Sequence, residues 1–183
     1  MSDAIAPGLL VSMPDLQDPN FLRSVILMCA HSDEGAFGLK INHPLTLTTA
    51  DVCAEIEIPW LGDDSTTVFS GGPVEPSRGW LLHGDEAMYP GSQHVAPGVA
   101  MSCSQEALQA YGQSPDGAFH LVLGYAGWGP GQLEQEMDQG SWMRAPFSRN
   151  LLFDTAADAM WSSALRSIGI DPLHLVGGGM VRH

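Results

Sequence analysis

Histidine and aspartate side chains near the ends of predicted strands are the first candidates for chemistry in this 183-residue sequence. His31 and His83 each follow an apolar run that predicts a strand, and Asp33 and His43 lie in turns. If these strand ends meet, His31, Asp33, His83 and His43 form a polar cluster that could bind a metal ion or move protons during hydrolysis. The alternative is that they are ordinary loop residues. The spacing predicts no metal site, because the histidines include no His-x-His and no His-Glu-x-x-His pattern.

A second candidate is a glycine-rich segment between a predicted strand at residues 120–123 and a helix that begins near Gln132. Its candidate residues are Gly124, Gly127, Trp128, Gly129 and Gly131. Strand, glycine loop and helix is the order found in phosphate-binding loops. The spacing matches neither Gly-x-Gly-x-x-Gly nor a Walker loop, and Glu134 and Glu136 in the first helical turns would repel an anion. The pattern favours a tight structural turn with Trp128 anchored in the core.

Paired carboxylates on that helix could do acid–base chemistry if burial separated their pKa values. Glu134 and Asp138 are four residues apart and share a face, and Glu136 lies on another. The neighbouring glutamines and the rarity of buried acids favour a solvated face instead. The sequence therefore assigns no catalytic acid.

The sequence offers no clear nucleophile either. Cys29, Cys53 and Cys103 are odd in number and far apart, which predicts reduced and mostly buried thiols, with neither disulfides nor a zinc site. The Gly-x-Ser-x-Gly pattern of a nucleophile elbow does not occur, so an α/β-hydrolase is excluded. Catalytic residues stay unknown, and we expect no cofactor.

Charge argues against direct binding of nucleic acid. Seven Lys and Arg residues stand against 21 Asp and Glu, for a formal net charge of -14, and the cations are scattered singly along the chain. Binding to phosphates requires several cations on one face. The longest apolar run, at residues 25–30, is far shorter than the roughly 20 residues of a membrane span, and no signal peptide is recognisable. We expect a cytoplasmic protein without membrane contact.

The elements that must position these candidates form an irregular series. Strands are predicted at residues 9–13, 23–31, 36–41, 67–70, 80–83 and 121–123, and at 95–103 with an interruption at Pro97-Gly98. Helices are predicted from a capping box at Thr48 to before Pro59, from Ser104 through Tyr111 with Gly112 as terminator, from Gln132, and at 157–168. Strands and helices do not alternate, which favours an α+β fold, and no linker divides residues 1–183, so we expect a single domain.

Several segments together resemble the YqgE/AlgH family of small bacterial proteins along nearly the whole chain. They are Leu9-Leu10-Val11-Ser12-Met13-Pro14, Asp18-Pro19-Asn20-Phe21, Gly71-Gly72-Pro73-Val74, and above all Gly124-Tyr125-Ala126-Gly127-Trp128-Gly129-Pro130-Gly131-Gln132-Leu133-Glu134. The resemblance implies a bifurcated mixed β-sheet curled into a pseudo-barrel with flanking helices, and a cytosolic location. The family is often described as a transcriptional regulator without an established activity, and it supplies no catalytic residues. Many members have Asn-Arg-Pro where this chain has Asn42-His43-Pro44, which replaces a permanent charge by a titratable ring.

Two functional hypotheses from different classes follow. The first is a non-enzymatic regulatory or interaction protein that binds a protein partner or a small ligand and does not contact DNA directly. The alternative is a hydrolytic or metal-dependent enzyme that uses the His/Asp cluster, which requires those residues to lie within hydrogen-bond reach of one another in a cleft. A third idea, in which acidic residues along one stripe imitate a nucleic acid, would require those acids to cluster.

Overall fold

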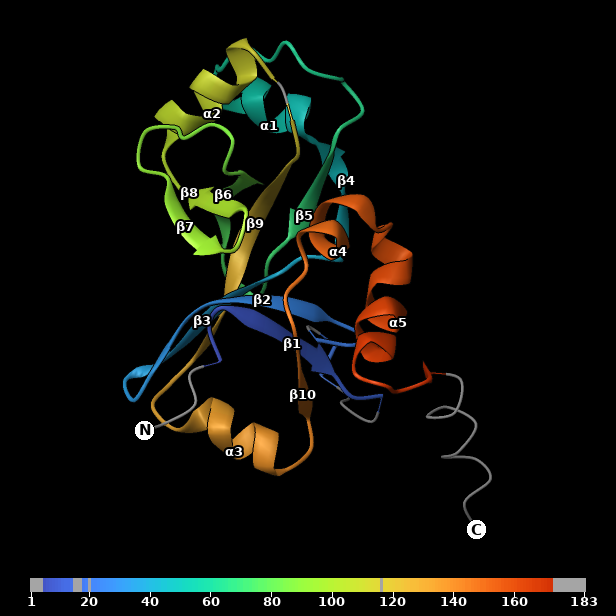
Figure 1. Cartoon of the computed structure of the whole chain (residues 1–183). Helices are drawn as coiled ribbons and strands as arrows, with labels where there is room; N and C mark the ends of the chain where they lie inside the picture. Colours follow the sequence, from blue (N-terminus) through green and yellow to red (C-terminus); the bar gives the residue numbers. More distant parts are fainter. Residues whose placement is uncertain (1–4, 15–17, 20, 116, 173–183) are drawn as a thin grey trace.

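The computed structural model describes residues 5–14, 18–19, 21–115 and 117–172, and within them ten strands and five helices form the expected α+β fold (Figure 1). The strands are β1 (Gly8–Ser12), β2 (Val25–Ser32), β3 (Gly35–Lys40), β4 (Pro44–Thr48), β5 (Thr67–Ser70), β6 (Val74–Gly84), β7 (Gln93–Ala96), β8 (Val99–Ser102), β9 (Phe119–Trp128) and β10 (Trp142–Ala145). The helices are α1 (Thr49–Glu55), α2 (Gln105–Gln113), α3 (Gln132–Asp138), α4 (Arg149–Asp154) and α5 (Ala157–Ser167).

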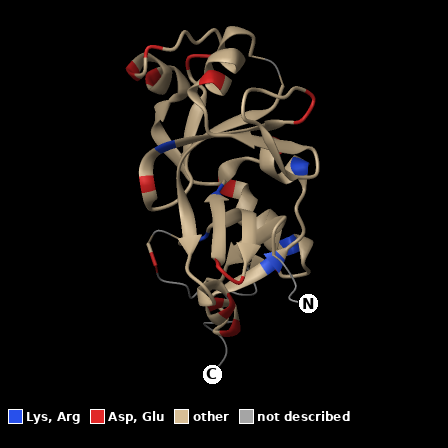
Figure 2. Cartoon of the chain, turned by 90° about the vertical axis from the view of Figure 1, so that its left-hand side faces the viewer, with Lys and Arg blue, Asp and Glu red and all other residues tan. Residues whose placement is uncertain are grey.

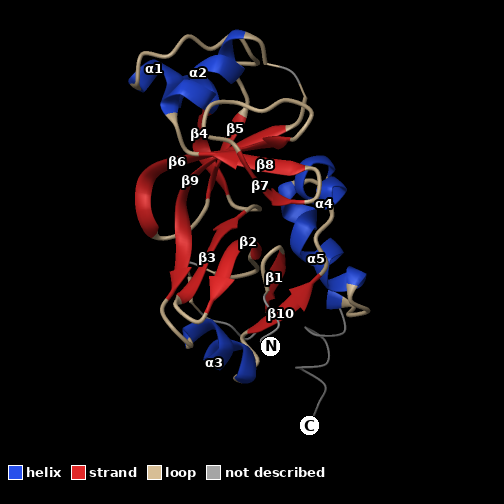
Figure 3. Cartoon of the chain, turned by 60° about the vertical axis from the view of Figure 1, so that its left-hand side comes forward, coloured by secondary structure: helices blue, strands red, loops and turns tan. Residues whose placement is uncertain are grey.

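Strand β9 joins the two parts of the sheet. The strand order is β10-β1-β2-β3-β9-β6-β8-β7, with β5 also paired to β9 and β4 paired to β5. Residues 126–128 of β9 pair with β3, whereas residues 119–125 pair with β6 and residues 121–123 run parallel to β5. Because β9 has three partners, the sheet divides along its length and curls, with β1, β2, β3 and β10 in one half (Figure 3). The bifurcated, mixed sheet expected from the resemblance is confirmed.

Glycines allow the backbone of β9 to lie directly against the segment that connects β5 to β6. A Cβ atom at Gly72, where φ is 149°, would lie 2.3 Å from the carbonyl carbon of Tyr125. A Cβ atom at Gly71 would lie 2.3 Å from the carbonyl oxygen of Gly124, and Gly124 has a φ of 80°. These approaches leave no room for a side chain, so the glycines are required where the sheet divides.

The helices cover different parts of the curled sheet. Helix α5 lies beside β1, β2 and β10, and α3 lies against β3 and β10. Helices α1 and α2 lie at the opposite end of the molecule from α3, at the top of Figure 1. The predicted apolar stripe on α5 is confirmed, since four of its side chains are buried: Met160, Trp161, Ala164 and Leu165. They pack in one core cluster with Leu9 and Leu27 of the sheet.

Local sequence signals located many element ends correctly. The capping box at the start of α1 is confirmed, because Thr48 Oγ1 accepts from the Asp51 N–H and Asp51 returns a bond to the Thr48 N–H. Strand β5 has the predicted bounds, and the predicted interruption at Pro97-Gly98 is the turn between β7 and β8.

Three predictions about element ends are wrong. Gly112 lies inside α2, which continues to Gln113, and does not terminate it. Residues 124–128, read as a loop, are the second half of β9, and residues 74–79, read as a turn-rich connection, are the first half of β6. In both cases glycine and proline signalled a turn, but pairing between β6 and β9 and with β3 decided the conformation. No helix among the described residues is long and apolar enough to cross a membrane.

Candidate functional site

The predicted polar cluster does not assemble into a metal site. Among the described residues, no group of three or more His, Cys, Asp or Glu side chains is placed to bind a metal ion. Asp33 is exposed in the turn between β2 and β3. The three histidines, His31, His43 and His83, make their hydrogen bonds to different partners.

His31 connects β2 to α3 and to the N-terminal segment. Its Nδ1 accepts from the Ile5 N–H at 3.1 Å, so Nε2 carries the proton and donates to Glu134 Oε2 at 2.9 Å. The pKa of Glu134 is lowered, mainly by a hydrogen bond from the backbone N–H of Glu134 itself and also by the hydrogen bond from the His31 ring. Glu134 is therefore paired to the sheet although its side chain is about half exposed, and is not simply one of several solvated acids as predicted.

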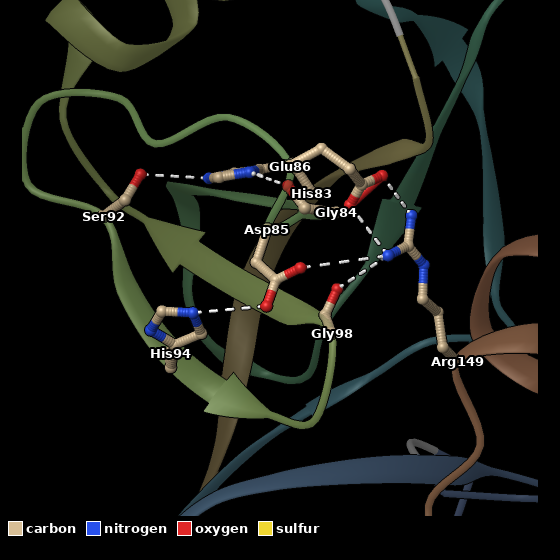
Figure 4. Close-up of polar contacts among 8 residues, drawn as sticks. All are labelled: His83, Gly84, Asp85, Glu86, Ser92, His94, Gly98 and Arg149. Carbon is tan, nitrogen blue, oxygen red and sulfur yellow. Dashed lines mark hydrogen bonds and ion pairs between the residues drawn. The ribbon is translucent and has the colours of Figure 1, made fainter.

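His83 is buried in β6 and holds the loop that leads to β7 (Figure 4). Its Nδ1 donates to the Gly84 carbonyl at 2.7 Å, which leaves Nε2 to accept from the Ser92 hydroxyl at 3.0 Å. Ser92 Oγ also accepts from the Tyr89 N–H at 3.0 Å. A serine hydroxyl bonded to a histidine Nε2 can be deprotonated, but here the same contacts close the turn at residues 89–92, and sequence reasoning missed this pair because no motif marks it.

His43 lies beside a buried lysine at the start of β4. The Lys40 ammonium donates to His43 Nδ1 at 3.2 Å, and Nε2 lies 3.4 Å from Ser24 Oγ. Burial and the Lys40 charge lower the pKa of His43, against backbone hydrogen bonds to Leu22 and Arg23 that raise it. The His43 side chain is therefore neutral at neutral pH.

Arg149 of α4 binds to the turns on either side of β7, one containing Glu86 and the other containing Gly98 (Figure 4). Arg149 binds both carboxylate oxygens of Glu86, with Nη1 2.8 Å from Oε2, and Nη1 also donates to the Gly98 carbonyl at 3.2 Å. Asp85 Oδ1 forms an ion pair with Arg149 Nη1 at 4.0 Å, and Asp85 Oδ2 lies 3.3 Å from His94 Nε2. This bidentate pair connects the C-terminal helices to the half of the sheet that contains β6, β7 and β8.

The Arg149 guanidinium lowers the pKa of Glu86 from its usual 4.5 to about 2. A carboxylate with a lowered pKa in the folded state stabilises the fold above pH 4.5, and this contribution disappears as the pH falls towards 2. We therefore expect Glu86→Gln to lower the midpoint of thermal unfolding at neutral pH, with a difference from the wild type that narrows between pH 4.5 and 2. Glu55→Gln, at an exposed position of α1, is the control and should follow the wild type throughout. A gap between Glu86→Gln and the wild type that is as wide at pH 2 as at neutral pH would contradict the assignment.

The cysteines differ in exposure more than their sequence context predicts. Burial raises the pKa of Cys29 to about 12 and also raises that of Cys53. Cys103 is exposed just before α2, so the prediction of mostly buried thiols does not hold there. All three are free thiols.

The glycine-rich segment uses its hydrogen-bond donors on groups of its own chain. The Gly129 N–H donates to Gln132 Oε1 at 3.0 Å, and the indole N–H of Trp128 donates to Glu136 Oε1 at 3.0 Å. Gly124 and Gly127 lie in β9, and Gly131, with a φ of 74°, immediately precedes α3. Trp128 is 7% exposed, so the predicted burial of this side chain is confirmed, although the residue ends strand β9 and does not lie in a turn.

Glu136 is the acceptor around which this corner is organised. The Trp142 indole N–H donates to the same Oε1 as that of Trp128, also at 3.0 Å, and Gln132 donates to Oε2. A recess of about 300 Å³ lies at this corner, lined by residues that include Phe21, Trp128, Glu136 and Trp142. Sequence reasoning placed Glu136 on a solvated face, because the tryptophans that bind it lie six and eight residues away on two different strands.

The fold and the site are those of an α+β protein in which strand β9 joins two half-sheets and the carboxylate of Glu136 accepts hydrogen bonds from Trp128 and Trp142. The chain belongs to the AlgH-like family, whose profile matches residues 9–173. A UPF0301 protein of Anaeromyxobacter dehalogenans is 40% identical over 96% of this chain and 94% of its own length, and one of Xanthomonas campestris is 40% identical over 93% of each.

Solved structures give the same result. The solution structure of the AlgH protein from Pseudomonas aeruginosa superposes with a TM-score of 0.80 at 32% identity, covering 97% of this chain and 96% of that one. The crystal structure of a Corynebacterium diphtheriae protein, at 24% identity and a TM-score of 0.72, has the same fold over 93% of this chain and 89% of its own. The names of these relatives state no activity.

Proposed function

We propose that the protein is a non-enzymatic regulatory or interaction protein, which binds a protein partner or a small ligand and does not contact DNA directly. The observation that carries the proposal is that several of its few Lys and Arg side chains contact other residues of the fold. Lys40 is 5% exposed, Arg78 lies 3.8 Å from Glu75, and Arg149 is held by Glu86. Arg23 stacks over Trp161, with 5.3 Å between its guanidinium carbon and the ring centroid. These four of the seven Lys and Arg side chains make contacts within the fold and come from separate elements, which leaves few cations for a phosphate backbone to bind.

The distribution of acids supports the same proposal. Figure 2 displays Asp and Glu residues at both ends of the molecule, with the few cations dispersed between them. An imitation of nucleic acid would require the acids to follow one stripe, so their spread argues against the third idea. An acidic surface also favours cationic partners, because it attracts them during encounter.

The enzymatic alternative loses its original basis. It requires the His/Asp cluster to meet within hydrogen-bond reach, whereas the contacts of His31, His43 and His83 lead to Glu134, Lys40 and Ser92 respectively. Each ring nitrogen described above already has a partner in the fold. Binding without catalysis is therefore the function that this geometry supports better.

A DNA-binding measurement tests the proposal directly. We expect no saturable change in the fluorescence anisotropy of a labelled duplex of about 30 base pairs in about 50 mM salt, where electrostatic binding is strong. Tight binding whose affinity falls steeply as salt is added would overturn it. In parallel, a thermal-shift screen of metabolites should identify a ligand, since saturation at about 100 times Kd adds about 2.7 kcal/mol of stability.

A further inference from the structure

The recess beside α3 combines aromatic walls with a fixed negative charge. Phe21 forms one wall, with its ring centroid 5.4 Å from that of Trp142 in an edge-on arrangement and 6.3 Å from that of Trp128. The two tryptophan rings meet at 80°, with 6.1 Å between centroids. Phe21 and Trp128 are nearly parallel, at 23° between ring planes, and Trp142 is edge-on to both. The three rings and the side chains of Glu136 and Asp18 line a recess of about 300 Å³.

Glu136 retains capacity to bind a further donor. An ionised carboxylate has about four acceptor positions. The two indoles use two of them on Oε1 and Gln132 uses one on Oε2. The indoles hold the carboxylate in place, because they donate from β9 and β10, which are separate strands of the sheet. An N–H or O–H of a ligand can bind the remaining position without displacing any of these bonds.

The charges around the recess favour a cation over an anion. Asp18 and Glu136 both line it. The Lys40 ammonium lies 5.8 Å from the Phe21 centroid but does not line the recess. The negative charge of Asp18 partly compensates the positive charge of Lys40. The nearby glycine segment does not provide an anion site, since the Gly129 N–H already donates to Gln132.

We propose that this recess binds an alkylammonium cation, whose charge interacts with the faces of the aromatic rings and with the carboxylate of Glu136. Aromatic rings attract ammonium groups through their quadrupole, and quaternary ammonium ligands are recognised by such aromatic sites. The inference deepens the proposed binding function and rests on it, because it names the class of ligand. The DNA measurement can fail or succeed independently of it.

Titration with choline, followed by the tryptophan indole N–H signals in a ¹H–¹⁵N spectrum, tests the proposal. The chain has five tryptophans, so the signals of Trp128 and Trp142 should move together and saturate while those of Trp60, Trp80 and Trp161 stay in place. 3,3-Dimethyl-1-butanol, the neutral isostere of choline, should bind at least about tenfold more weakly, since it keeps the shape and lacks the charge. Equal binding of the two compounds would overturn the proposal, as would inorganic phosphate moving the same two signals.

Two substitutions separate charge from packing. Glu136→Gln keeps an oxygen for both indoles but removes the charge, and should weaken choline binding by about tenfold or more. Asp138→Asn removes the same charge from an exposed position of the same helix and should leave binding unchanged. Phe21→Leu, at a half-buried position, should weaken binding without loss of the fold, which thermal unfolding will verify. If Glu136→Gln and Phe21→Leu both fold and bind choline like the wild type, the recess is not the site.

A further titration identifies the source of the cation. Nα-acetyl-lysine amide presents a primary ammonium on a side chain, as a protein partner would. Tighter binding of this compound than of choline assigns the recess to a lysine of a partner, and the reverse order assigns it to a free quaternary ammonium compound. Movement of neither Trp128 nor Trp142 with either compound overturns the proposal.

Discussion

Replacing Gly72 by alanine is expected to destabilise the fold by about 4 kcal/mol or more. The added Cβ would lie 2.3 Å from both the carbonyl carbon and oxygen of Tyr125 and 2.6 Å from the Ala126 nitrogen. These are backbone atoms of β9, which pairs with β3, β5 and β6 and so cannot move aside without breaking hydrogen bonds in both half-sheets. The φ of 149° at Gly72 adds strain of its own, because side chains disfavour that region.

Urea unfolding followed by circular dichroism measures the effect. Gly129→Ala is the matched control, because its Cβ would meet no atom closer than 3.9 Å and its backbone has no positive φ. We expect the control to remain within about 0.5 kcal/mol of the wild type. Gly124→Ala should resemble Gly72→Ala, since its Cβ would lie 2.5 Å from the Gly72 carbonyl oxygen. A Gly72→Ala protein as stable as the control would show that the backbone at Gly72 does not lie against the backbone of β9.

Gly72 and Gly124, where the two backbones come into contact, illustrate why the pairing of strands in the sheet was harder to predict than the strands themselves. The central apolar runs of β2 and β9 and the stripe on α5 are local patterns, and each gave an element of the correct type. The second half of β9 contains Gly124 and Gly127, and glycine in isolation signals a turn. Its extended conformation is imposed by pairing with β3 and β6, whose paired residues are about 50 to 90 positions away in the chain, so no local pattern contains that information.

Short elements at the periphery were missed for a related reason. Strand β10 has four residues and pairs only with β1 in the described sheet, and α4 has six residues between two polar caps. Segments of that length have too few positions for a period to be recognised. Strand β4, which begins at Pro44, is extended because it pairs with β5.

The candidate site shows the same limit at the level of side chains. Sequence alone indicated that histidines follow strands, but which strand ends meet depends on the order of strands in the sheet. His31 proved to be the partner of Glu134, 103 residues away, whereas His83 holds its own loop. Glu136 lacked any signal, since an acid on a glutamine-rich helix is ordinarily solvated and only the tertiary fold brings Trp128 and Trp142 to it.

Replacing Trp161 by alanine is expected to cost about 3–5 kcal/mol of stability. The side chain is 6% exposed, and its indole N–H donates to the Ser12 carbonyl at 2.8 Å. Ser12 is opposite Trp142 in the β1–β10 pairing, so this bond attaches α5 to the strands that form one edge of the sheet. The substitution would remove a large buried ring from the main core cluster and leave a cavity there.

Two further variants distinguish the packing of the ring from its hydrogen bond. Trp161→Phe keeps most of the ring but loses the donor, and should cost about 1–3 kcal/mol, the penalty for a buried polar group that loses its partner. Leu61→Ala, at a position that is 69% exposed, should change stability by less than about 0.5 kcal/mol. If Trp161→Ala were no more destabilising than Leu61→Ala, α5 would be an appendage to the sheet. The expected order, with Trp161→Phe between the two, would instead make this helix part of the structure that fixes β1 and β10, and through β10 the tryptophan that lines the recess.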